Sequence, residues 1–208
     1  MIKCIIPARK NSRRIIGKNL LKLNGDTLID IAVESALQSS VCDEIIVSTD
    51  ISDGFRRMGV TVDRRPAATA KSRSSSGSLI EHLIKKHRFN DDDTVILLQP
   101  TSPNRRGIDI KRALEIFKTN NVPVVSVFEY NKLSDNLFKP EKEGFIRKIS
   151  FKERMIYRMN GAIFIFSVTH FKKCGGVPQE RVMPYIMDEK DSTDIDEYLD
   201  YIKAVVLK

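Results

Sequence analysis

The chain has no tryptophan, only three cysteines and three histidines, and no long hydrophobic run. Cys4, Cys42 and Cys174 are odd in number, far apart in the sequence and without cysteine or histidine neighbours, which argues against a disulfide framework and a zinc site. No Ser-His-Asp arrangement is recognisable. No apolar stretch approaches the roughly 20 residues of a membrane span, and the apolar N-terminal run is too short for a signal peptide. We therefore expect a cytoplasmic protein without a membrane partner.

The chain does contain a surplus of positive charge. Among its 208 residues, 35 Lys and Arg stand against 27 Asp and Glu, a formal net charge of +8. Hydrophobic residues make up 41% and charged residues 30%, as in an ordinary folded protein. The length suits a single domain over residues 1–208. The charge favours an anionic partner, which could be a nucleotide, a nucleic acid or an acidic sugar.

Apolar runs typical of buried strands alternate with segments of helical period. The expected strands cover residues 3–8, 44–50, 59–62, 93–99, 122–128 and 160–166, and the expected helices cover 26–40, 75–87, 107–120 and 194–208. This alternation predicts an α/β fold with a mostly parallel sheet and helices on both faces. It stops at residues 130–158, a charged and irregular segment that we interpret as an insertion projecting from the sheet.

A basic loop follows the first predicted strand. The stretch CIIPARKNSRRIIGKNL places basic residues at 9, 10, 13, 14 and 18 beyond the end of a strand, where ligands bind in parallel sheets. It is not a Walker loop, because Asn19 follows Gly17-Lys18 where Ser or Thr is needed, and it is not a dinucleotide fingerprint. Converging cations suit a polyphosphate, since one cation–anion contact at about 4 Å gains roughly 4 kcal/mol gross. A phosphate-binding loop, a nucleic-acid arm and a solvated charge cluster remain open on these residues alone.

Six segments together resemble the acylneuraminate cytidylyltransferases, which make CMP-activated sialic acids and related nonulosonates. They are IPARKNSRRIIGKNL, EIIVSTD, RRP, LLQPTSPNRRG, NGAIFIF and DSTDIDEYLD, in the family's order and spacing. The resemblance implies a Rossmann-like fold and transfer of CMP from CTP to the anomeric hydroxyl of a nine-carbon acidic sugar such as sialic, pseudaminic or legionaminic acid, with release of pyrophosphate. Related Kdo cytidylyltransferases carry an aspartate where this chain has QPTSP, which points away from that branch. A Kdo derivative remains the alternative acceptor.

The resemblance also implies roles for individual residues. In the basic loop, Arg9, Arg13 and Lys18 would be catalytic, holding and neutralising the leaving pyrophosphate. The implied nucleotide-binding residues are Arg9, Ser12, Lys18, Asn19, Arg65 and Ser76. The implied acceptor-binding residues are Gln99, Asn160, Phe164, Arg147, Lys148 and Arg158. Considered without the family, Asn19 could be a helix cap and Gln99 a hydrogen bond at a strand end.

Asp194 and Asp196 are the candidate metal ligands. Their spacing puts both carboxylates on one side of an extended segment, where they can share a hard cation, although acidic residues also suit the first turn of the closing helix. In the family the matching pair binds Mg²⁺, which bridges to the phosphates, so the resemblance implies Mg²⁺ as the cofactor. There it would lower the pKa of the attacking hydroxyl. No side chain is recognisable as a general base.

The chain departs from the family pattern at three places. Phe164 stands where a tyrosine is common, and Gly175 and Gly176 stand near a place where sialic acid enzymes often have bulky aromatic residues. Ser72 stands where an aspartate is usual. The first two departures concern the acceptor side, so the reaction type is better determined than the sugar.

From the insertion at residues 130–158 we predict that the protein is a homodimer. Its apolar residues at positions 133, 137, 138, 145, 149 and 151 need burial, and a two-fold exchange of such arms buries both copies. The resemblance implies that Arg147, Lys148 and Arg158 point toward the partner's sugar carboxylate. A nucleic-acid-binding module would need exposed aromatic residues on a sheet, but the chain has no tryptophan and its phenylalanines fall mainly in apolar runs. We therefore expect no nucleic-acid partner.

Overall fold

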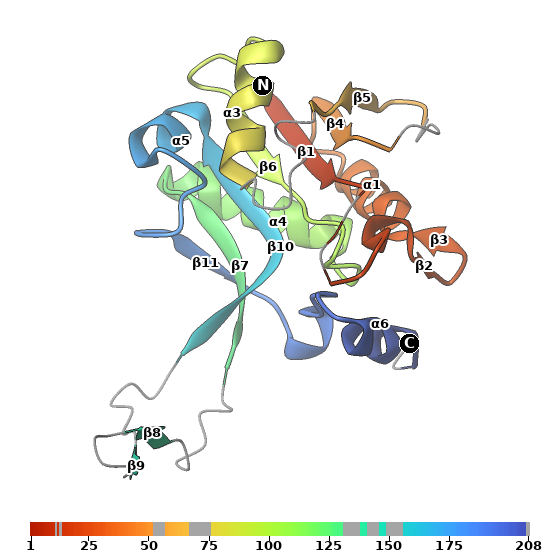
Figure 1. Ribbon diagram of the computed structural model, residues 1–208. Coiled ribbons are helices and arrows are strands. Elements are labelled where there is room, and N and C mark those ends of the chain that lie inside the picture. The colour runs from red at the N-terminus through yellow and green to blue at the C-terminus, as the bar shows by residue number, and fades with distance from the viewer. Residues whose placement is uncertain are drawn as a thin grey trace.

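The computed structural model describes residues 1–10, 12, 14–51, 57–66, 76–130, 138–140, 146–148 and 156–206. Its centre is a seven-stranded sheet (Figure 1). In order across the sheet, the strands are β11 (Met183–Ile186), β7 (Val124–Glu129), β10 (Tyr157–Ser167), β6 (Thr94–Leu97), β1 (Ile2–Ala8), β4 (Glu44–Thr49) and β5 (Thr61–Arg64). Strand β10 is antiparallel to both neighbours, and the other neighbouring pairs are parallel. The predicted mostly parallel sheet is confirmed.

Helices cover both faces of this sheet. Residues of α1 (Leu28–Ser39) and α4 (Gly107–Asn120) pack on one face, and residues of α3 (Ser76–Lys86) and α5 (Val168–Cys174) pack on the other. The connections hold η1 (Lys18–Leu20), β2 (Lys22–Leu23), β3 (Asp26–Thr27) and η3 (Glu189–Asp191), and α6 (Tyr198–Val206) is the last helix. None of the helices in the described part of the chain has the length and apolar character that crossing a bilayer requires.

Successive residues of the central strands face opposite sides of the sheet. In β1, Cys4 and Ile6 belong to the apolar cluster under α1 and α4, and Ile5 belongs to the cluster under α3 and α5. In β6, Ile96 and Leu97 divide in the same way. Because both faces are covered, neither set of positions can be polar, and the strands therefore appear in the sequence as continuous apolar runs.

Strand β11 is not predicted by the sequence. It has only four residues, of which Pro184 cannot donate a backbone hydrogen bond, and it lies at the edge of the sheet beside β7. An edge position tolerates proline because one side of the strand needs no partner. The strand matters for the site because the segment that follows it carries Asp194 and Asp196.

Gly107 allows α4 to start close against α1. A Cβ atom at this position would lie 2.7 Å from the backbone carbon of Gln38 and 2.7 Å from the backbone nitrogen of Ser39. A backbone clash of this kind cannot be relieved by a side-chain movement, so only glycine permits the contact. The close approach holds the loop from β6 to α4 against the sheet.

A third apolar cluster connects the basic loop to the C-terminal segment. Ile15 of the loop packs with Leu28, Ile195 and Ala204, and Ile195 is fully buried. Ile195 lies between the two candidate metal ligands, Asp194 and Asp196. Its burial therefore holds both carboxylates beside the basic loop, although Lys18 and Ile195 are 177 positions apart in the chain.

The predicted insertion begins where the β7–β10 ladder leaves the body of the sheet. The ladder continues to a hydrogen bond from the Tyr130 nitrogen to the Ile156 oxygen, at 2.8 Å. Beyond it, β8 (Phe138–Pro140) and β9 (Ile146–Lys148) form a separate antiparallel pair that lies well away from the seven-stranded sheet (Figure 1).

Candidate active site

A cavity of about 230 Å³ opens at the carboxyl ends of β1 and β6. Besides Pro7, Leu79, Pro100 and Thr101, its walls contain predicted site residues from both the basic loop and distant segments: Arg9, Ser12, Lys18, Asn19, Arg65, Ser76, Gln99 and Asp196. We call this the basic cavity. The topology brings these side chains together, as expected for loops at the carboxyl edge of a parallel sheet.

The basic loop is held in shape by its own polar contacts. The side-chain amide of Asn19, which is 5% exposed, donates a hydrogen bond of 2.8 Å to the carbonyl of Arg9. The backbone nitrogen of Lys10 donates to the carboxylate of Asp50 at 2.6 Å, so the end of β4 supports the loop. Asn19 thus stabilises the loop from within while it lines the basic cavity. This arrangement differs from a solvated charge cluster.

Lys18 is a buried cation of the site. Its side chain is 11% exposed, and its Nζ donates to the Ile195 carbonyl at 2.8 Å and to Asp196 Oδ1 at 3.0 Å. Arg14 donates to the second oxygen of Asp196 at 2.8 Å. Burial opposes ionisation of Asp196, but the hydrogen bonds and charges of Lys18 and Arg14 outweigh it and lower the pKa of Asp196. The loop and the acidic segment therefore form one charged unit.

Two arginines carry like charges into the same cavity. Arg65, which follows β5, is 8% exposed and lines the wall together with Arg9. Burial lowers the pKa of Arg65, and the neighbouring charge of Arg9 lowers it further. Cations that repel one another are stabilised by an anion placed between them, so the cavity is suited to a group with several negative charges.

Asp194 has the opposite electrostatic character to Asp196. Its Oδ1 atom is buried without a hydrogen-bond partner. Burial raises the pKa of Asp194, and the negative charge of Asp196 raises it further, while a hydrogen bond from the Thr101 side chain acts against both. A buried carboxylate oxygen without a partner is costly unless a cation or a proton compensates it.

Asp194 lines a second cavity of about 670 Å³, which we call the acidic-side cavity, whereas Asp196 lines the basic cavity. The two cavities approach each other at Gly161. A Cβ atom on this residue would lie 3.0 Å from Gln99 Oε1, on the wall of the basic cavity, and 3.7 Å from Asp194 Oδ2.

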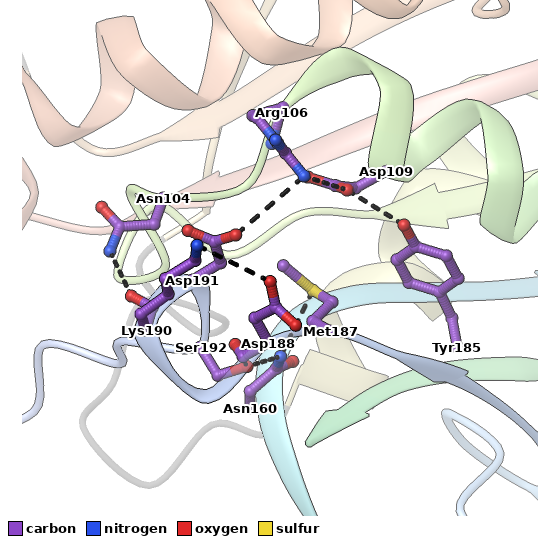
Figure 2. Close-up of polar contacts among 10 residues, drawn as sticks. All are labelled: Asn104, Arg106, Asp109, Asn160, Tyr185, Met187, Asp188, Lys190, Asp191 and Ser192. Atoms are coloured by element: carbon purple, nitrogen blue, oxygen red, sulfur yellow. Dashed lines mark hydrogen bonds and ion pairs between the residues drawn. The ribbon is translucent and has the colours of Figure 1, made fainter. Parts of the chain in front are cut away.

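A buried amide joins β10 to the loop that precedes Asp194. Asn160 is 2% exposed and donates to Ser192 Oγ at 2.9 Å and to Met187 Sδ at 3.3 Å (Figure 2). Its Oδ1 accepts from Ser126 Oγ at 2.6 Å and from the Ala162 nitrogen at 3.2 Å. Both amide protons and both acceptor positions are occupied. The amide therefore orders the loop. Asn160 also lines the acidic-side cavity, and its contact with the sugar stays a prediction.

The same loop is held from its other side by the segment before α4 (Figure 2). Asn104 donates to the Lys190 carbonyl at 3.0 Å and to Thr193 Oγ1 at 3.2 Å. Arg106 lies 4.0 Å from Asp191. The sequence analysis missed these contacts, and it missed Asn104 on the wall of the acidic-side cavity. The only sequence signal was the position of Asn104 within QPTSPNRRG.

A family model described as cytidylyltransferase matches residues 3–167 of the chain. The chain belongs to the cytidylyltransferase family. A CMP-N,N'-diacetyllegionaminic acid synthase of Legionella pneumophila is 35% identical over 96% of this chain and 93% of its own length. An N-acylneuraminate cytidylyltransferase of Escherichia coli is 31% identical over 100% of this chain but 52% of its own, so the chain spans about half the length of that relative.

Solved structures show the same fold. A CMP:2-keto-3-deoxy-manno-octonic acid synthetase in complex with CTP has a TM-score of 0.72 at 17% identity, over 99% of this chain and 97% of its own. A 4-diphosphocytidyl-2C-methyl-D-erythritol synthase has a TM-score of 0.68 at 12% identity, over 100% of this chain and 99% of its own. These likenesses show that the cytidylyltransferase shares the fold of both structures.

Some predicted site residues of this cytidylyltransferase lie away from the basic cavity. Phe164 is 5% exposed and packs in the apolar cluster under α3 and α5, so the geometry does not support a contact with the sugar. Arg158 lines the acidic-side cavity, with its guanidinium carbon 5.7 Å from the centre of the Tyr130 ring. Arg147 is described in its backbone position in β9.

The remaining predicted positions are described incompletely or not at all. Lys148 pairs with Phe138 in the β8–β9 ladder, and its side chain, like that of Arg147, lies outside the described residues. Arg13 and Ser72 lie entirely outside them. The catalytic role of Arg13 and the effect of the Ser72 departure therefore stay predictions.

Asp194 and Asp196 could supply some of the ligands of a magnesium ion. Within the described residues, no group of three or more His, Cys, Asp or Glu side chains could hold a metal. Asp194 supplies a carboxylate oxygen without a partner, and Asp196 supplies a carboxylate with a lowered pKa. Magnesium is commonly bound through one or two carboxylates, with waters and substrate phosphates as the other ligands. The residues present suit such a site and do not form a complete protein cage.

Proposed function

We propose that the enzyme transfers CMP from CTP to the anomeric hydroxyl of a nonulosonate, an acidic nine-carbon sugar, and releases pyrophosphate. The observation that carries the proposal is the convergence of Arg9, Lys18 and Arg65 in one cavity beside a pair of aspartates. The names of the two relatives, which act on legionaminic and acylneuraminic acids, support the acceptor class.

The reaction joins the sugar oxygen to the α-phosphorus of CTP and breaks the bond to the β-phosphate. Such a step depends on positioning and on neutralising the leaving group. Arg9 and Lys18 would bind the β- and γ-phosphates, and Arg13 would add a third cation as the resemblance implies. Asn19 keeps the loop closed while the phosphates bind. Arg65 and Ser76, across the basic cavity, would contact the nucleoside.

We further propose that Asp194 and Asp196 hold Mg²⁺ against the phosphates. When bound, the ion would neutralise charge at the α-phosphate and lower the pKa of the attacking hydroxyl. In the structure, Lys18 and Arg14 hold Asp196 in its place at the mouth of the basic cavity. Lys18 is therefore already close to the position where phosphate charge would bind.

The proposed function is tested by nucleotide choice and by product. We expect CTP to bind at least tenfold more tightly than ATP or GTP in calorimetry, because Arg65, Ser76 and Asn19 match family positions that contact the nucleotide. Pyrophosphate release with CTP should require a nonulosonate from a panel of sialic, pseudaminic and legionaminic acids. Equal binding of all nucleotides would contradict the cytidine assignment. Turnover with Kdo and with none of the nonulosonates would establish the alternative acceptor.

We also propose that the enzyme is a cytoplasmic homodimer in which residues 130–158 reach the partner's site. The extension of the β7–β10 ladder away from the core supports this proposal, because it carries the β8–β9 pair away from the seven-stranded sheet (Figure 1). Arg147, Lys148 and Arg158 would then approach the partner's acceptor. We expect light scattering at micromolar concentration to give twice the mass of the chain. A fully active monomer would rule out the shared site.

A further inference from the structure

Arg105 is a buried cation within the segment LLQPTSPNRRG, six residues after Gln99. It lies in the loop from β6 to α4 and is 3% exposed. Its Nη1 donates to the carbonyls of Gln99 at 3.1 Å and Ala162 at 2.8 Å, and its Nε donates to Ser35 Oγ at 3.2 Å. Its Nη2 is buried without a partner. The guanidinium thus joins the loop after β6 to β10 and α1.

The charge of Arg105 is not balanced by an ion pair with any described carboxylate. In the described part of the chain, no carboxylate lies within ion-pair distance of its guanidinium, and the nearby Asp109 is bound to Arg106 and Tyr185. Burial lowers the pKa of Arg105 to about 10. An unpaired buried cation destabilises a fold, and an apolar side chain of similar size would avoid that cost. The stability of the core does not explain why an arginine stands here.

The two carbonyls that Arg105 binds flank the junction of the two cavities. Gln99 carries its side chain on the wall of the basic cavity. Ala162 follows Gly161, whose φ of 72° belongs to an irregular turn inside β10, where the ladder shifts register. The gap at this junction is small, because a Cβ atom on Gly161 would lie 3.0 Å from Gln99 Oε1. The Arg105 guanidinium therefore fixes the distance between Gln99 and Ala162 across this junction.

We propose that Arg105 is a positioning residue for the transfer step. It fixes Gln99 relative to the Gly161 turn at the junction of the two cavities. The inference rests on the proposed function, because the junction lies beside Asp194 and Asp196, where the acceptor hydroxyl and the α-phosphate would meet. Nη1 binds both carbonyls while Nε, in the same rigid plane, is held by Ser35 Oγ, so the direction of both bonds is fixed. A lysine ammonium could reach the carbonyls but has no second nitrogen for Ser35 to hold. Small displacements of a reacting group cost up to about 100-fold in rate.

The first experiment compares Arg105→Lys with Arg112→Lys, the same substitution at an exposed position on α4. We expect kcat for CMP transfer to fall at least tenfold in Arg105→Lys, with the Kd for CTP within threefold of the original protein. The control should keep both values. An unchanged kcat, or a loss of CTP affinity in proportion to kcat, would overturn the proposal, because the second result indicates general distortion.

The second experiment asks whether Arg105 acts through Gln99. In a double-mutant cycle with Gln99→Ala, Arg105→Lys should cause little further loss, since the side chain that it positions is already absent. Additive losses would overturn the proposal. If Arg105→Lys does not fold, Ser35→Ala, which removes only the hydroxyl bonded to Nε, takes its place in the same cycle and is judged by the same criterion. If the original protein transfers no CMP to any nonulosonate, the proposed function fails. If it does and the cycle is additive, only this inference fails.

Discussion

Replacing Asp194 by asparagine is expected to lower kcat for CMP transfer by about a thousandfold, or ~4 kcal/mol in the transition state, as for the loss of a metal that neutralises developing charge. The substitution keeps the size of the side chain and removes its charge. The Oδ1 atom of Asp194 is buried without a partner, so the side chain has a free oxygen for a cation. Pyrophosphate release at saturating CTP measures kcat, and a magnesium titration by calorimetry measures metal binding.

The stability of this variant separates a metal role from a structural one. Burial raises the pKa of Asp194, so its ionised form destabilises the metal-free folded state at neutral pH. The asparagine side chain carries no charge, and we expect the free energy of unfolding without magnesium to stay equal or rise. Asp188→Asn, in the same loop with its side chain 74% exposed, is the control and should keep full activity. Magnesium-dependent turnover within tenfold of the original would mean that the metal binds elsewhere.

Replacing Lys18 by methionine is expected to lower kcat/KM for CTP by at least about 30-fold, which corresponds to ~2 kcal/mol for a lost hydrogen bond to a charged group. Methionine keeps the length and apolar contacts of the buried side chain. Asp196 keeps its contact with Arg14, so the acidic segment retains one of its two cationic partners. Steady-state kinetics and calorimetry with CTP measure the loss.

The control for Lys18 is Lys22→Met, at an exposed position on β2 just after the loop. It should leave kcat/KM within twofold, because a solvated charge outside the basic cavity contributes little to binding. If Lys18→Met kept the kcat/KM and the CTP affinity of the original protein, the basic loop would be a solvated charge cluster and not a phosphate-binding site. A loss of similar size in both variants would point to net charge and not to a bound phosphate.

The positions of the main strands and helices could be predicted because their signals are local. The run from Cys4 to Ile6 is apolar at every residue since both faces of β1 are buried, and the period of residues 107–120 matches the buried side of α4. The basic loop and Asp196 were also identifiable, because the topology rule for parallel sheets and the family resemblance agree on them. Strand β11 could not be predicted, because a four-residue edge strand with Pro184 has too weak a local pattern.

The sequence by itself determined the fold class, the family, and most side chains of the basic cavity, since each depends on residues near one another in the chain or on a shared motif order. Only the tertiary structure decided how those side chains are used. It made Asn160 a buried amide that orders a loop, and it paired Lys18 with Asp196 across 178 positions. It also made Arg105 a bridge between β10, α1 and the loop after β6. Contacts of this kind depend on how the sheet brings distant segments together, and no periodicity or local spacing carries that information.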